Sequence, residues 1–137
     1  MWKLFDYRDE KGNNLIARWT RKLQKPQRIK LRAKLDDLAN FGPELPPGLL
    51  MKTEIEHVYK LKVQGNPKLR PMICFGLFFI KDVKTGTEKR EEAITILVGA
   101  KEISWEFEPP QADVEAAIRR KKILADPNRR IPHERID

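Results

Sequence analysis

A nearly continuous apolar run at residues 72–80 (MICFGLFFI) constrains the fold more than any other part of this chain. Successive side chains of a strand point to opposite faces of a sheet, so a run that is apolar at both parities needs cover on both faces. We therefore expect a central strand at residues 72–81. Helices should cover one of its faces, and a further layer, either the last helix or a partner, should cover the other.

Two more strands are predicted on either side of this run, at residues 58–63 and 93–101. Turn residues separate the three segments, with GNP at residues 65–67 and TGT at residues 85–87. Connections as short as these favour an antiparallel meander. A further strand is predicted near the N-terminus, at residues 2–7.

Three helices are predicted around these strands. Asn14 can cap the first helix, in which apolar residues recur at helical spacing as far as Leu23. Pro26 suits the first turn of the second helix, which ends at the Pro- and Gly-rich residues 41–48. The third helix is expected at residues 111–125, after two prolines. The sequence thus predicts an α+β fold in which two N-terminal helices pack as a hairpin on the sheet and a C-terminal helix follows.

The length of 137 residues fits one domain with a single core. We expect this domain to occupy residues 1–126 and a polar tail to follow at residues 127–137. The N-terminus has no signal-like pattern, and no apolar stretch approaches the roughly eighteen residues that a membrane-spanning helix needs. These features favour a cytoplasmic protein with no membrane partner.

The charge of the chain is basic and unevenly distributed. There are 28 Lys and Arg residues against 20 Asp and Glu residues, which gives a formal net charge of +8. Eight of these basic residues and no acidic residue lie within residues 14–35. The exposed side of the helical hairpin should therefore attract polyanions such as RNA, DNA or a ribosome, although solubility is a competing explanation. The candidate RNA-binding residues are Arg18, Arg21, Lys22, Lys25, Arg28 and Arg32.

A second group of cations is predicted on the sheet. Lys60 and Lys62 alternate with apolar residues in the strand at 58–63, so they should share a solvent face. Arg70 opens the next strand and would join them if the two strands pair. Cations held close to phosphoryl oxygens can stabilise the transition state of RNA cleavage by the neighbouring ribose hydroxyl. The competing interpretation is an ordinary solvated face for the lysines, and for Arg70 an ion pair with a nearby carboxylate.

Other kinds of catalysis have little support in the sequence. His57 and His133 are the only histidines, Cys74 is the only cysteine, and none lies at metal-ligand spacing from another. There is no glycine-rich phosphate loop and no recognisable nucleophile motif. We expect no metal and no small-molecule cofactor, and we interpret His57 as a polar edge residue rather than a proton carrier.

Several short motifs follow one another in an order typical of a known family. They are the basic helical hairpin, the Pro/Gly loop, residues 59–63 (YKLKV), Arg70, residues 98–101 (VGAK) and residues 116–120 (AAIRR). Over residues 14–124 this order resembles the RelE/ParE toxin superfamily, most closely its HigB-like, phage-associated branch. The resemblance implies a small fold in which two N-terminal helices pack against a curved antiparallel sheet.

The same resemblance implies a function. Members are toxins neutralised by a cognate antitoxin, here expected to be a helix-turn-helix protein. The implied activity is a ribosome-dependent endoribonuclease that cuts messenger RNA by metal-free attack of the ribose 2′-hydroxyl. The catalytic residues that it implies for this chain are Lys60, Lys62, Arg70 and Lys101. Arg70 and Lys101 would steady the phosphate charge, while Lys60 or Lys62 would contact the phosphate or transfer a proton.

Two alternatives remain open. A ParE-like protein would use the same fold as a non-nucleolytic inhibitor that grips a protein such as gyrase. A phage accessory protein would keep the scaffold without the chemistry. Residues 98–103 motivate this second alternative, because they keep a single lysine, Lys101, and follow it with an acid. We interpret Trp105 as a core or edge residue rather than a platform for a stacked base.

Overall fold

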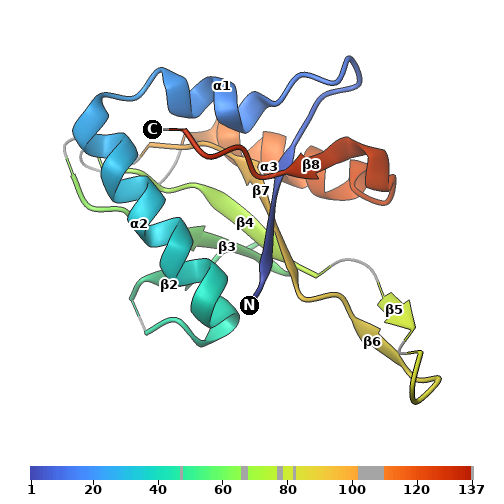
Figure 1. The fold of residues 1–137 in the computed structure, drawn as a ribbon. Helices are drawn as coiled ribbons and strands as arrows, with labels where there is room; N and C mark the ends of the chain where they lie inside the picture. The colour runs from blue at the N-terminus through green and yellow to red at the C-terminus, as the bar shows by residue number, and fades with distance from the viewer. Residues whose placement is uncertain (47, 66–67, 77–78, 82, 102–109, 137) are drawn as a thin grey trace.

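The structure, a computed structural model, describes residues 1–137 except 47, 66–67, 77–78, 82, 102–109 and 137 (Figure 1). Its main element is a six-stranded sheet with the strand order β2-β3-β4-β7-β1-β8. These strands are β1 (Lys3–Tyr7), β2 (Leu50–Lys52), β3 (Val58–Leu61), β4 (Met72–Phe75), β7 (Ala93–Val98) and β8 (Arg130–Pro132). A two-stranded ribbon of β5 (Phe79–Lys81) and β6 (Glu88–Arg90) projects away from the body of the protein (Figure 1).

Helices cover both faces of the main sheet. Helices α1 (Leu15–Arg21) and α2 (Lys25–Phe41) pack on one face, and α3 (Gln111–Ile123) packs on the other. The short 3-10 helices η1 (Gly42–Glu44) and η2 (Pro127–Arg129) follow α2 and precede β8. The fold is therefore α+β, and its first helix follows a strand.

Local chemistry explains where the helices begin and end. Asn14 Oδ1 accepts a hydrogen bond from Ala17 N at 2.9 Å, so the predicted cap of α1 is confirmed. At the start of α2, Gln27 Oε1 accepts a hydrogen bond from Gln24 N at 3.3 Å. The same helix ends at Gly42, whose φ of +55° is a conformation that glycine adopts without steric cost.

Strand β4 is central and buried on both faces, as predicted. All four of its residues are buried. Ile73 and Phe75 belong to the apolar layer under α1 and α2, whereas Met72 and Cys74 belong to the layer under α3. The further cover that the sequence required is therefore α3.

Two predictions about the sheet are wrong in part. The expected strand at residues 72–81 ends at Phe75, and its continuation, β5, pairs with β6 outside the main sheet. Gly76 follows β4 directly, and glycine in a strand often marks a bend. The antiparallel meander β3-β4-β7 is confirmed, but the whole sheet is mixed, because β1 pairs with β7 in parallel. The long intervening chain permits such a parallel pairing.

The segment predicted as a polar tail takes part in the fold. Strand β8 pairs antiparallel with β1, with Tyr7 opposite Arg130. Beyond this strand, His133 N donates to Leu4 O at 3.0 Å. An edge strand is held by its backbone, so a polar composition does not prevent this pairing.

Cys74 is buried in the apolar layer under α3, and this burial should make its thiol unreactive. Burial raises the pKa of this thiol from its ordinary 9.0 to about 12. Because the thiolate is the reactive form, the folded protein should react with a disulfide reagent at pH 8 at least about tenfold more slowly than the denatured protein. Unfolding should also become easier as the pH rises above 9.0, where only the unfolded thiol ionises. Equal labelling rates for the two states would contradict this packing.

Candidate nucleic-acid interface

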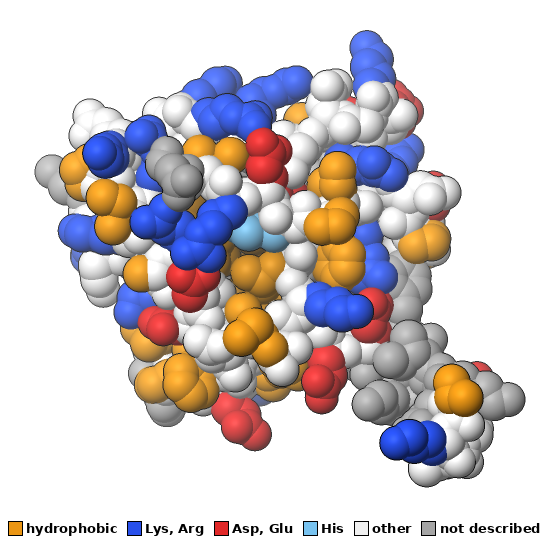
Figure 2. All heavy atoms as spheres, in the orientation of Figure 1, with side chains coloured by type: hydrophobic (Ala, Val, Ile, Leu, Met, Phe, Trp, Pro, Cys, Tyr) orange, Lys and Arg blue, Asp and Glu red, His pale blue; other side chains and the backbone are white. Residues whose placement is uncertain are grey.

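The cations predicted to bind RNA lie on α1, on α2 and on the connection between them. Arg18, Arg21, Lys22 and Lys25 are exposed. Figure 2, which looks onto this side of the molecule, shows Lys and Arg side chains gathered around α1 and the start of α2. This part of the surface is therefore available to a polyanion.

Arg28 and Arg32 lie further along α2 and are only partly exposed. Arg28 Nη1 donates to Leu23 O at 2.5 Å, so this guanidinium ties α2 to the segment that connects it to α1. Its Nε is buried and has no hydrogen-bond partner among the described residues. The structure thus gives Arg28 a packing role that the sequence did not reveal.

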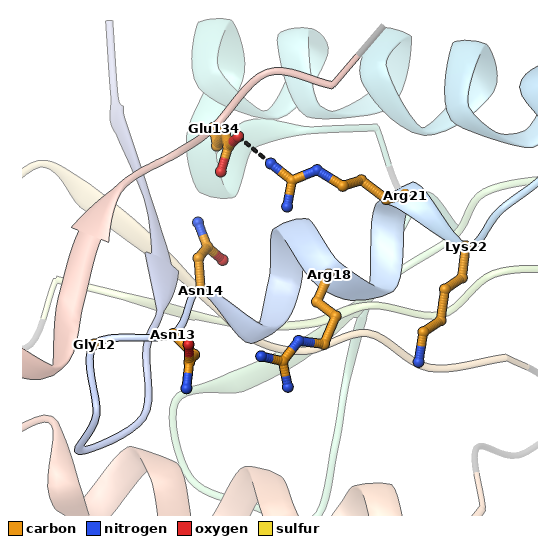
Figure 3. Close-up of a pocket in the computed structure, with 7 residues that line it drawn as sticks. All are labelled: Gly12, Asn13, Asn14, Arg18, Arg21, Lys22 and Glu134. Atoms are coloured by element: carbon orange, nitrogen blue, oxygen red, sulfur yellow. Dashed lines mark hydrogen bonds and ion pairs between the residues drawn. The ribbon is translucent and has the colours of Figure 1, made fainter.

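An open hollow of about 460 Å³ lies beside α1 (Figure 3). It is lined by Gly12, Asn13, Asn14, Arg18, Arg21, Lys22 and Glu134. Arg21 reaches toward Glu134 and forms an ion pair with it, whereas Arg18 and Lys22 point away from that carboxylate (Figure 3). Three cations, two amide side chains and a single carboxylate therefore surround one cavity.

The buried carboxylate of Asp6 fixes the walls of this hollow. Its Oδ2 accepts hydrogen bonds from Asn14 Nδ2 at 2.9 Å and from Glu134 N at 3.0 Å. Its Oδ1 lies 2.8 Å from His133 Nδ1. One side chain on β1 thus holds both the cap of α1 and the C-terminal segment. The sequence gives little indication of this group, whose only signal is an acid between Phe5 and Tyr7.

Asp9 fixes the turn between β1 and α1. Its carboxylate accepts hydrogen bonds from Asn13 N at 2.8 Å, from Asn13 Nδ2 at 3.1 Å and from Lys11 N at 3.0 Å. The bonds from Asn13, and to a smaller extent Lys11 and the charge of Arg18, lower the pKa of Asp9. The ionised Asp9 carboxylate therefore holds Asn13 in place at the edge of the hollow.

The four predicted catalytic cations gather at one end of the sheet but lie on both of its faces. Lys60 is opposite Met72, and the pairing continues to a bridge between Val63 and Leu69. Lys62 is therefore opposite Arg70, and Lys60, Lys62 and Arg70 lie on the α3 side. A second bridge joins Leu69 to Lys101, which places Lys101 with Leu69 on the α1–α2 side.

A β-bulge explains why Lys101 is separated from the other three cations. Met72 pairs with Val98 and Ile73 with Ile96, so Leu97 is an extra residue in β7. An inserted residue moves every later side chain to the opposite face. Arg120 stabilises the bulge by donating Nη1–H to Leu97 O at 2.8 Å.

The expectation of a shared solvent face is wrong for Lys60. Lys60 is 7% exposed and Arg70 is 3% exposed, because their face of the sheet is covered, whereas Lys62 is half-buried and Lys101 is exposed. Arg70 Nη1 donates to Leu69 O at 2.8 Å. The carboxylate of Glu56, in the turn before β3, lies 3.3 Å from His57 Nε2.

The remaining sequence predictions concern single side chains. His57 is exposed in the turn before β3, where its φ is +64°. Trp105 falls within residues 102–109, outside the described part of the chain. Among the described residues, no three His, Cys, Asp or Glu side chains form a group able to hold a metal ion. No helix in this part of the chain has the length and apolar character that crossing a membrane requires.

Comparison with protein-family models, with curated proteins and with solved structures finds no match to this chain. Fold alone does not determine function, so the function of this chain has to follow from its site.

Proposed function

We propose that the chain is a toxin of the RelE/ParE type, a ribosome-dependent endoribonuclease that cuts messenger RNA by metal-free attack of the 2′-hydroxyl. One observation carries the proposal, namely the exposed basic surface of α1 with the hollow lined by Arg18, Arg21 and Lys22. Surfaces of this kind bind phosphate backbones by charge attraction and counterion release.

The arrangement of the elements adds support. Two helices from the N-terminal half cover one face of the sheet, β3, β4 and β7 are antiparallel, and a late helix covers the other face. The RelE-like fold is part of this proposal. So is a helix-turn-helix antitoxin whose acidic or amphipathic segment masks the basic surface in the cytoplasm.

The four cations at the end of the sheet then divide the catalytic work. Lys62 is the accessible member of the α3 side and contacts the phosphate. Arg70, opposite it, contributes positive charge from a buried position, where charge acts more strongly than in water. Lys101 approaches the same end from the α1–α2 side. Lys60 contributes positive charge from a buried position on the α3 side of the sheet.

Induction of the chain in bacteria without an antitoxin should stop growth and leave cuts within translated messages. Lys62→Met should slow cleavage by about a hundredfold or more, as expected when a group that stabilises transition-state charge is removed. Lys52→Met, at an exposed strand lysine in β2, is the matched control and should remain toxic. Primer extension on induced cells measures the cuts, and arrested cells with intact messages would refute the nuclease.

The burial of Lys60 and Arg70 favours a second candidate, a non-nucleolytic inhibitor. Such a protein would bind through the basic α1 surface alone. It predicts growth arrest without message cleavage, unchanged by Lys62→Met and relieved by Arg21→Gln. Harmless expression of the wild-type chain would instead support the accessory protein.

A further inference from the structure

Glu134 places a carboxylate inside a hollow that three cations line. It is the single acidic residue among the seven that line the hollow, and its side chain pairs with Arg21 (Figure 3). A carboxylate and a phosphate offer similar paired oxygens to a guanidinium. Glu134 therefore occupies a position on Arg21 that suits a phosphoryl group.

The backbone that carries Glu134 is fixed, but its side chain is free to leave. Glu134 N is anchored on the buried Asp6 carboxylate, and the neighbouring His133 is held by the same group. The side chains of Arg21 and Glu134, by contrast, are 55% and 46% exposed. An ion pair with this exposure is weak, so a ligand can replace the carboxylate without moving the segment.

The rest of the cavity suits an anion larger than a carboxylate. Arg18 and Lys22 line the same hollow without pointing at Glu134, and Asn13 and Asn14 contribute amide groups (Figure 3). A volume of about 460 Å³ leaves room beside Arg21 for a phosphate and an attached sugar. The cavity is also open to solvent, and a site that binds one phosphate of a long nucleic-acid strand has to be open.

We infer that this hollow is a phosphate-binding site in which Glu134 is an internal competitor, displaced from Arg21 when a phosphoryl group binds. Taking RNA as the source of that group rests on the proposed function. The site itself does not, because free pyrophosphate presents the same chemistry. The competitor would make binding of a phosphoryl group weaker.

The test compares two variants that each lose one negative charge. Glu134→Gln removes the competitor, and Glu44→Gln removes an exposed carboxylate at the other end of α2. Binding of a fluorescent single-stranded RNA octamer and of pyrophosphate is measured at about 50 mM salt, where charge effects are large. Glu134→Gln should bind about three- to fivefold more tightly than the wild type, and Glu44→Gln should change little, since the exposed pair is worth no more than this.

A third variant shows whether the gain acts through Arg21. In an Arg21→Gln background, Glu134→Gln should bring no further gain, because the two residues act as a coupled pair. Equal gains for Glu134→Gln and Glu44→Gln, or a gain that persists without Arg21, would reduce the effect to net charge and overturn the inference. Absence of binding by both probes would overturn it too.

The two probes separate this inference from the proposed function. If Glu134→Gln tightens pyrophosphate binding while no variant binds RNA, the phosphate site stands and the nuclease proposal fails. If the gain appears with RNA, the site is a subsite for the RNA backbone. Cleavage activity enters neither result.

Discussion

Asp6→Ala is expected to lower the free energy of unfolding by about 3–5 kcal/mol, the range for breaking a buried charged network. Asp6 is fully buried and accepts hydrogen bonds from Asn14 and Glu134 while facing His133. Alanine leaves these partners without an acceptor in a place that water reaches poorly. It also releases the C-terminal segment from the cap of α1.

Asp6→Asn should cost much less, about 1–2 kcal/mol, because an amide keeps the shape and most of the bonds. The amide oxygen can take the place of Oδ2 and accept from Asn14 and Glu134. The amide nitrogen then faces His133 Nδ1, which can accept when the imidazole proton is on Nε2. The difference in unfolding free energy between Asp6→Ala and Asp6→Asn therefore measures what the oxygen at the Oδ2 position contributes by accepting from both Asn14 and Glu134.

Chemical denaturation followed by circular dichroism gives both values. Asp37→Ala is the matched control, since Asp37 lies on α2, is 47% exposed and meets Lys34 at 4.0 Å. Its cost should stay within about 0.5 kcal/mol, as for most exposed ion pairs. A similar cost for Asp6→Ala and Asp37→Ala would show that the buried network does not hold the fold together.

The parts of this fold that the sequence predicted correctly are those with local causes. The cap at Asn14 and the end of α2 at Gly42 each depend on a few neighbouring residues. The central strand followed from the apolar residues at 72–75, which have to be covered on both faces wherever the other elements lie. The basic surface followed from the composition of one helical hairpin.

The parts that escaped prediction depend on contacts between distant segments. Asp6 and His133 are 127 positions apart, so no spacing rule connects them. The extra residue at Leu97 gives no sequence signal, yet it moves Lys101 to the face opposite Lys62. The sequence therefore did not predict that the four candidate cations are divided between the two faces of the sheet.

The close contact between β7 and α1 gives the second large effect. Gly99 lies against Trp19, and a Cβ added to this glycine would be 2.0 Å from Trp19 Cδ2. No real side chain tolerates such a distance, so Gly99→Ala must push the indole and, with it, the helix that carries Arg18 and Arg21. We expect a loss of about 2–3 kcal/mol, as for other overpacked cores.

A double-mutant cycle with Trp19→Leu tests this cause directly. Leucine is smaller than the indole and leaves space for the new methyl group, so Gly99→Ala should cost at least about 1 kcal/mol less in that background. Gly86→Ala, where nothing lies within 4 Å but φ is +69°, measures the separate cost of replacing a glycine in a turn. Strictly additive effects of Gly99→Ala and Trp19→Leu would mean that the indole does not set the position of α1 on the sheet. In that case the placement of α1 against the end of β7 would need another physical explanation.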